Sequence, residues 1–366
     1  MGASLSISKR NHAIDFIKIA ATIIIVFHHY TQVVYASGHG VFHGGTIYFG
    51  RCVELFFLIS GYLMYRYQTA IHDHEISFKR FYGKRALRLL PLVAISAIVY
   101  EILILLYRKL TGTLYMNHDL DLSGTLFTCL GIQTGWATPN PAINNPVWFV
   151  SVLLLCYLIF YFLNYISGKR NINVNYLYLG MVFLGMGIVT YKINLPFLYY
   201  SSPEDSSPAK GYYAFFAGIL LANFLAVHKS KINKLSIAAL VMIAGTVLAI
   251  VYKARNNQVF DDFYWLTFVF FPSLIILAET KAAQKIFSAD FWSLLAKIAY
   301  NVFIWHVCME IVFNYLLKTY PVLAQRTEWK MMLVALILDW IVGFLSYRFI
   351  EKPIAAKTDR FFAKML

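Results

Sequence analysis

Residues 13–36 read AIDFIKIAATIIIVFHHYTQVVYA. The stretch is apolar apart from a few polar side chains, and it exceeds the ~20 residues that an α-helix needs to cross the hydrocarbon core of a bilayer. An apolar run near the start of a chain can be a cleaved signal peptide, but no small-residue cleavage site follows this one. We therefore expect a transmembrane helix that the protein retains.

The composition of the whole chain has the same character. Of its 366 residues, 59% are hydrophobic and only 14% are charged, whereas a soluble domain averages about 45–50% apolar and about 25% charged residues. The mean hydropathy is +0.60. These values exclude a soluble enzyme, a nucleic-acid-binding module and a disordered protein. They favour an all-α, polytopic membrane protein.

About ten apolar runs are long enough to be spans. They are continuous and do not alternate between polar and apolar residues, so they predict helices and not the strands of a membrane barrel. A shorter apolar piece at about 122–135 is expected to be re-entrant or to lie at the membrane surface. We expect residues 1–366 to form one integral-membrane domain. The predicted spans are 13–36, 46–66, 91–107, 147–166, 175–195, 212–227, 235–252, 263–279, 298–317 and 330–349.

The distribution of basic residues predicts the orientation. The formal charge is +14, which in a soluble protein would indicate a nucleic-acid partner. Here the segments that face one side, if the spans alternate, hold most of the 32 Lys and Arg residues. Because basic loops stay on the cytoplasmic side, we expect both termini in the cytoplasm.

The first span carries titratable groups that are costly in a bilayer and therefore indicate function. Lys18 and His29 are eleven residues apart, which places them on one helical face and ~16 Å apart along the axis. His306 lies at a comparable depth in a later span. An imidazole, with an ordinary pKa of about 6.5, suits acid–base catalysis near neutral pH. The alternative is that each histidine only bonds a neighbouring helix.

The second span contains two further polar features. Arg51 and Glu54 are three residues apart and can pair on one face. Ser60 and Gly61 form a small surface that a ligand or another helix can approach closely. A structural ion pair and plain helix packing are the alternatives to a functional role for these residues.

A basic segment precedes the third span. Arg85 and Arg88 share a helical face and could grip phosphates in bidentate fashion. The alternative is a helix that contacts lipid headgroups. Pro91 is expected to start the next helix, because proline is favoured at a first helical position.

At this point the chain resembles the acyltransferase 3 family of bacterial integral-membrane acyltransferases, in its branch without a fused soluble esterase-like domain. The resemblance spans nearly the whole chain and rests on six elements in the family's order. It departs from the family where Trp148 is not followed by the usual acidic pair and where Phe303 replaces a frequent tyrosine. The elements are Lys18-x10-His29, FFLISGY at 56–62, RALRLLP at 85–91, NPVWF at 145–149, YNVFIWH at 300–306 and YRFIEKP at 347–353.

The resemblance implies transfer of an acyl group, usually acetyl, from cytoplasmic acyl-CoA to a hydroxyl of a cell-surface or lipid-linked glycan in the bacterial inner membrane. His29 is then the expected general base, and His306 the second candidate for acid–base work. The donor phosphates are expected on Lys18, Arg85 and Arg88. The tunnel where donor and acceptor meet is expected to be lined by Ser60, Gly61, Trp148, Arg51 and Glu54.

Apart from acyl-CoA as co-substrate, we expect no bound cofactor, and the histidines lack a ligand set at metal-binding spacing. The expected partners are the acyl donor, the glycan acceptor and membrane lipids, without nucleic acid. The competing reading is a transporter or flippase for a glycan or its lipid-linked precursor. Against it, we see no two related halves with broken helices at matching positions.

Overall fold

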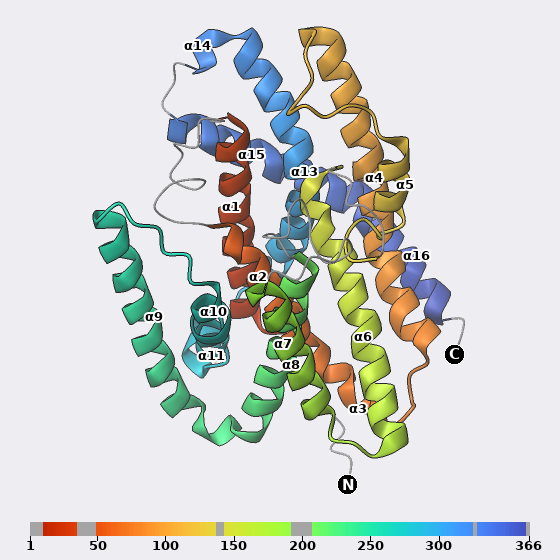
Figure 1. The fold of residues 1–366 in the computed structure, drawn as a ribbon, viewed down its shortest axis with the longest axis vertical. Helices are drawn as coiled ribbons and strands as arrows, with labels where there is room; N and C mark the ends of the chain where they lie inside the picture. Colours follow the sequence, from red (N-terminus) through yellow and green to blue (C-terminus); the bar gives the residue numbers. More distant parts are fainter. Residues whose placement is uncertain (1–9, 35–48, 137–142, 192–206, 325–327, 364–366) are drawn as a thin grey trace.

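The computed structural model describes residues 10–34, 49–136, 143–191, 207–324 and 328–363, and within these ranges the fold is all-α (Figure 1). The first half contains α1 (His12–Val34), α2 (Cys52–Met64), α3 (Gln68–His72), α4 (Phe78–Thr111), α5 (Leu122–Cys129), α6 (Trp148–Arg170), α7 (Val174–Thr190) and α8 (Ser207–Val227). The second half contains α9 (Ile232–Arg255), α10 (Phe263–Trp265), α11 (Phe271–Ala278), α12 (Lys281–Ile286), α13 (Phe291–Thr319), α14 (Pro321–Ala324), α15 (Glu328–Ser346) and α16 (Lys352–Ala363).

Seven helices of the described residues are long and apolar enough to cross a membrane, which makes the chain a multi-pass membrane protein. They correspond to seven of the ten expected spans. The expected spans at 175–195 and 263–279 correspond to the shorter apolar helices Val174–Thr190 and Phe263–Ala278. The span expected at 46–66 contains α2, which has 13 residues. The count of ten spans and the cytoplasmic termini therefore stay predictions.

The expectation that Pro91 starts a helix is wrong. Helix α4 begins at Phe78, where the Ser77 side chain accepts a hydrogen bond from the Arg80 N–H, and it ends at Thr111, followed by Gly112 with φ +70°. Pro91 lies inside it and removes one i→i−4 hydrogen bond. The helix continues through this defect because both halves are packed, with Phe81 buried before the proline and Leu92 buried after it.

The centre of the bundle depends on glycines that allow two helices to touch. A Cβ on Gly61 of α2 would lie 1.8 Å from the Phe215 carbonyl oxygen of α8, and a Cβ on Gly218 of α8 would lie 2.0 Å from the Leu58 carbonyl oxygen of α2. No side chain fits in either space. Small residues at such crossings let helix backbones approach closely inside a membrane.

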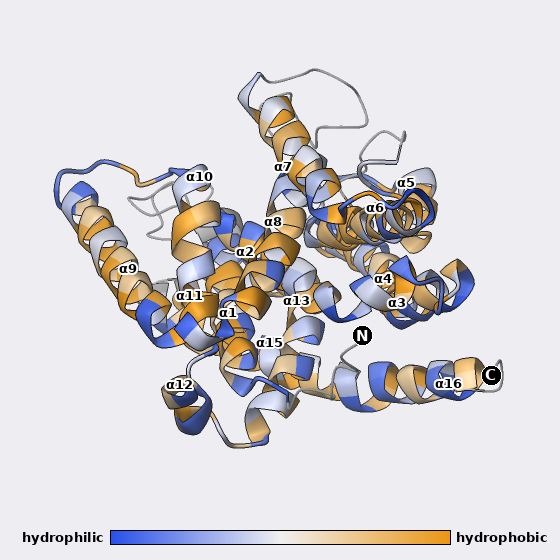
Figure 2. Ribbon diagram, turned by 90° about the horizontal axis from the view of Figure 1, so that it is seen from below, coloured by the Kyte–Doolittle hydropathy of each residue, from blue (hydrophilic) through white to orange (hydrophobic). Residues whose placement is uncertain are grey.

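One end of the bundle, which we call the basic end, is formed by the starts of α1, α4 and α13 together with α12 and α16. The His12 ring nitrogen Nδ1 lies 3.0 Å from the Ala289 carbonyl oxygen, which joins α1 to the start of α13. Lys84 of α4 pairs with Asp359 of α16 at 2.7 Å. Viewed from this direction, α16 and α9 lie at opposite edges of the bundle, and α16 carries both hydrophilic and hydrophobic residues (Figure 2).

Candidate functional site

Two histidines from helices that are far apart in the sequence meet inside the bundle. The ring centroids of His29 on α1 and His306 on α13 are 5.1 Å apart. His306 is fully buried, whereas His29 is partly accessible. This contact agrees with the comparable depth expected for the two histidines, whose depth in a membrane stays a prediction. Their roles in catalysis are not tested by this geometry alone.

The hydrogen bonds of His306 assign its tautomer. Its Nδ1 lies 2.9 Å from the Phe303 carbonyl oxygen and 3.3 Å from that of Val302. Because a carbonyl oxygen only accepts, the proton of a neutral ring is assigned to Nδ1. The lone pair is then on Nε2, which has no hydrogen-bond partner among the described residues. A buried nitrogen of this kind can accept a proton from a group that enters the site.

Aromatic rings form the wall between the histidines and α6. The Phe303 ring lies 6.0 Å from His306 and 5.7 Å from Phe56 of α2, between ring centroids. Phe149, directly after Trp148 at the start of α6, is 5.6 Å from Phe303. Trp148 itself is 6.0 Å from Phe57. Several of these aromatic residues belong to the family elements found in the sequence. Because the wall is made of aromatic rings, a group beside His306 Nε2 would lie in largely apolar surroundings.

Asn144 fixes the start of α6 relative to the histidine. It is fully buried and adopts a left-handed conformation with φ +43° immediately before the turn Asn145–Val147. Its Nδ2 donates to the Ile304 carbonyl oxygen at 3.1 Å and to Ser96 Oγ at 2.9 Å. This residue therefore ties the loop before α6 to α4 and to α13, two residues before His306.

Lys18, a predicted donor-binding residue, lies at the basic end but already has a partner. Its Nζ is 3.4 Å from Asp15 Oδ1, and Arg10 Nε is 2.6 Å from Asp15 Oδ2. Asp15 is buried, so one carboxylate holds two cations. The same-face argument for Lys18 did not identify Asp15, although its spacing of three residues from Lys18 was a usable signal.

Arg85, the second of these residues, lies among aromatic rings. Its guanidinium carbon is 3.7 Å from the centroid of Phe81 and 4.3 Å from that of Tyr67. The side chain also donates to the Phe81 carbonyl oxygen at 2.7 Å. Cation–π contacts and this hydrogen bond hold the group in place. The Arg85 guanidinium carbon is also 5.4 Å from the ring centroid of Tyr157 of α6.

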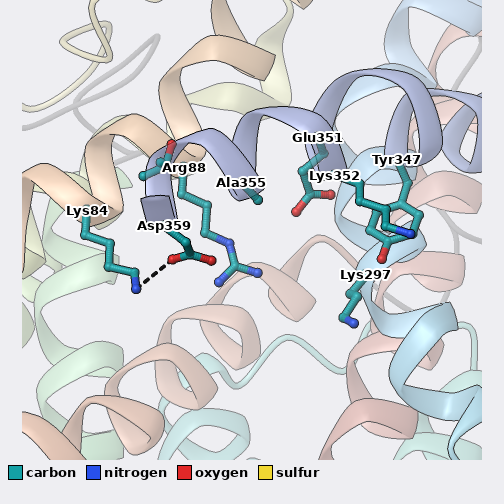
Figure 3. A pocket seen from close by; sticks show the side chains of 9 residues that line it. Lys84, Arg88, Lys297, Tyr347, Glu351, Lys352, Ala355 and Asp359 are labelled. Carbon is teal, nitrogen blue, oxygen red and sulfur yellow. Dashed lines mark ion pairs between the residues drawn. The ribbon is translucent and has the colours of Figure 1, made fainter. Parts of the chain in front are cut away.

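Arg88, the third, faces a pocket at the basic end. This pocket, between α4, α13 and α16, has a volume of about 170 Å³ (Figure 3). Figure 3 shows the Arg88 guanidinium directed into the space between Asp359 and Glu351. The α16 pocket, as we call it, is lined by Lys84, Arg88, Lys297, Tyr347, Glu351, Lys352, Ala355, Thr358 and Asp359.

Of the other residues predicted to line a tunnel, Arg51 and Glu54 do pair, at 3.5 Å, as the spacing predicts. Arg51 makes its shorter contacts with Asp261, at 2.7 and 2.9 Å. Ser60 is partly accessible beside Gly61, whose contact with α8 accounts for the glycine through packing alone. Lining of a substrate tunnel stays a prediction for these residues.

Further polar groups, which the sequence already shows as titratable residues within predicted spans, lie close to the histidine pair. His28 is buried, with its ring centroid 5.2 Å from that of His29, and it interacts electrostatically with His306. Glu310 is buried one turn beyond His306 and interacts with Asp339. Neither oxygen of Glu310 has a hydrogen-bond partner within the described ranges. In that same part of the chain, no group of three His, Cys, Asp or Glu side chains is placed to hold a metal ion.

Comparison with known proteins gives one match. A sequence model of the family described as an acyltransferase domain, acyltransferase 3, matches residues 11–347, which is nearly the whole chain. No curated protein and no solved structure matches the chain significantly. Helix α16 follows the matched region, so four of the residues that line the α16 pocket come from a helix that the family match does not include.

Proposed function

The chain belongs to the acyltransferase 3 family, and from this premise we propose that it transfers an acyl group, most simply acetyl, from acyl-CoA to a hydroxyl of a cell-surface or lipid-linked glycan. The observation that carries this proposal is the pair His29–His306, 5.1 Å apart, with a buried and unpartnered Nε2 on His306. The proposed location is the bacterial inner membrane, with the basic end in the cytoplasm, where acyl-CoA is found.

The proposed reaction uses the imidazoles for proton transfer. His29, the more accessible of the two, takes the proton of the glycan hydroxyl, and the hydroxyl oxygen attacks the carbonyl carbon of the thioester. A C–O ester bond forms and the C–S bond breaks. The proton passes from the imidazole to the departing sulfur, which leaves as the CoA thiol. His306 lies beside His29, and its Nε2 lone pair offers a second position that can accept the hydroxyl proton in place of His29.

The donor is proposed to enter from the basic end, where Lys18, Arg85 and Arg88 lie. Arg88 supports this role most directly, because its guanidinium faces a pocket. Arg85 is held among the rings of Phe81, Tyr67 and Tyr157. Cations at this end suit the phosphates of CoA, since arginine binds phosphate in bidentate fashion. The buried histidines then keep the thioester away from bulk water.

The test is release of CoA from acetyl-CoA by the detergent-purified protein. We expect slow release by the wild type, because water can replace the acceptor, and a loss of at least about 100-fold in His29→Ala. The matched control is His228→Ala, which removes a histidine whose Nδ1 contacts only its own helix, at the Phe224 carbonyl oxygen. Wild-type release by His29→Ala, with unchanged elution in size-exclusion chromatography, would refute the role of His29.

The donor site has a separate test. Arg88→Ala should raise KM for acetyl-CoA by about 10-fold or more, because a hydrogen bond between charged partners contributes about 1.5–3 kcal/mol. An unchanged KM would remove Arg88 from the donor site. A transporter, by contrast, would neither bind CoA nor release it from the thioester, and it would move a glycan precursor without CoA.

A further inference from the structure

The α16 pocket has an excess of positive charge. Its lining includes four cations, Lys84, Arg88, Lys297 and Lys352, and two carboxylates, Glu351 and Asp359. The formal charge of the lining is therefore +2. Arg88 and Lys352 are exposed and Lys297 is partly accessible, so an anion from solution can reach this excess charge, which attracts it. The pocket thus has the charge of a binding site for a dianion.

Both carboxylates of the pocket already have partners. Asp359 pairs with Lys84 at 2.7 Å, which ties α16 to α4. Glu351 accepts a hydrogen bond of 2.5 Å from Asn301 Nδ2 of α13. Figure 3 shows the Arg88 guanidinium on the Asp359 side of Glu351, and the Lys297 and Lys352 side chains on its Tyr347 side. Among the described residues, none of these three charged groups makes a hydrogen bond or ion pair through its side chain, although all three share the pocket with the Glu351 carboxylate.

The size of the pocket restricts the ligand to one group. At about 170 Å³ it is smaller than the about 300–1,000 Å³ of sites that enclose a whole small molecule. The pocket can accommodate a phosphate but not a complete nucleotide. A phosphate monoester carries a charge of about −1.5 to −2 at neutral pH and three acceptor oxygens. This charge matches the formal excess of the lining.

The position of the pocket relates it to the histidines. Lys297 and His306 are on the same helix, nine residues apart, so they are ~14 Å apart along its axis. Tyr300 lies between them on α13. A molecule with a phosphate in the pocket could therefore extend along α13 toward the histidine pair. Acyl-CoA has this form, with a phosphate monoester on its ribose and the thioester at the far end of a flexible arm.

We propose that the α16 pocket binds the 3′-phosphate of acyl-CoA, through Arg88, Lys297 and Lys352, and so selects CoA over its 3′-dephospho form. This inference rests on the proposed acyltransferase function and adds the residue Lys352, which follows the matched family region. Helix α16 then serves as one wall of the donor site, fastened to α4 by the pair Lys84–Asp359.

The experiment compares binding of CoA and 3′-dephospho-CoA to the full-length protein in detergent by isothermal titration calorimetry. The variants are Lys352→Ala and Lys297→Gln. The matched control is Lys357→Ala, which removes an exposed cation of α16 that does not line the pocket. We expect the wild type and the control to bind CoA at least about 10-fold more tightly than 3′-dephospho-CoA. Each pocket variant should bring this ratio close to one.

Three results would overturn the proposal. Equal binding of the two compounds by the wild type, with CoA release from acetyl-CoA intact, would refute the phosphate pocket and leave the proposed function standing. No binding of either compound would refute both. The third result would show that the pocket binds the phosphate of a lipid headgroup and not that of CoA. If native mass spectrometry shows that Lys352→Ala loses bound phosphatidylglycerol while its preference for CoA is unchanged, the pocket is a lipid site.

Discussion

A network of hydrogen-bonded side chains lies near His306 on α13, and we predict its contribution to the stability of the protein. Asn301 on α13 is fully buried; its Nδ2 donates to Glu351 Oε2 at 2.5 Å, and its Oδ1 accepts from Ser346 Oγ at 2.7 Å. Trp305 Nε1 donates to the same Ser346 hydroxyl at 2.8 Å. These bonds join α13 to the end of α15 and to Glu351, from which α16 continues.

Replacement of Asn301 by alanine removes both of its bonds in this network and a third, in which Nδ2 donates to the Lys297 carbonyl oxygen at 3.1 Å. A hydrogen bond to a charged group contributes about 1.5–3 kcal/mol and a neutral one about 0.5–1.5 kcal/mol. One bond to a charged group and two neutral bonds predict that Asn301→Ala lowers the free energy of unfolding by about 2.5–6 kcal/mol. Asn301→Asp should cost at least as much, because it replaces the donor with a second carboxylate beside Glu351.

The assay is unfolding by increasing SDS in mixed micelles, followed by tryptophan fluorescence. The double variant Asn301→Asp with Glu351→Gln exchanges donor and acceptor, so it should recover part of the loss seen in Asn301→Asp alone. If Asn301→Ala unfolds within about 0.5 kcal/mol of the wild type, or if the double variant is no more stable than Asn301→Asp, the reasoning is refuted.

Two further predictions concern the core and the histidine pair. Gly218→Val should prevent stable folding, because even its Cβ would lie 2.0 Å from the Leu58 carbonyl oxygen. The control Gly180→Ala should express normally, because no heavy atom lies within 4 Å of the added Cβ. Equal yields of the two variants in detergent extracts would contradict this account of the contact. For the site, His29→Ala and His306→Ala should each reduce CoA release by at least about 100-fold, and the double variant should lose little more than the worse single one, because residues that act as a unit are not additive. Fully multiplicative losses would show two independent roles.

Much of the architecture could be predicted from the sequence, since apolar length and continuity determine which segments can cross a membrane. The multi-pass, all-α fold follows from this property. Depth along a helix is also predictable, and the depth of His29 and His306 agrees with their contact. Which helices lie side by side depends on close packing, such as that of Gly61 against Phe215, which periodicity does not specify.

Local rules failed where packing decided the outcome. Pro91 predicts a helix start, but Ser77 caps α4 earlier and buried residues on both sides of the proline hold the helix together. Arg85 and Arg88 share a face as their spacing predicts. Their long side chains nevertheless have different neighbours. The Arg85 guanidinium packs on aromatic rings, whereas Arg88 lines the α16 pocket. The α16 pocket joins residues more than 200 positions apart, which no spacing rule relates.

The most direct test of the central claim is transfer of radiolabel from [¹⁴C]acetyl-CoA to the envelope glycans of membranes that contain the protein. We predict that label appears in the glycan fraction with the wild type, that alkali releases it as acetate because the bond is an ester, and that His29→Ala membranes incorporate at least about 100-fold less. Incorporation by His29→Ala at the wild-type rate, with equal amounts of protein, would contradict the account.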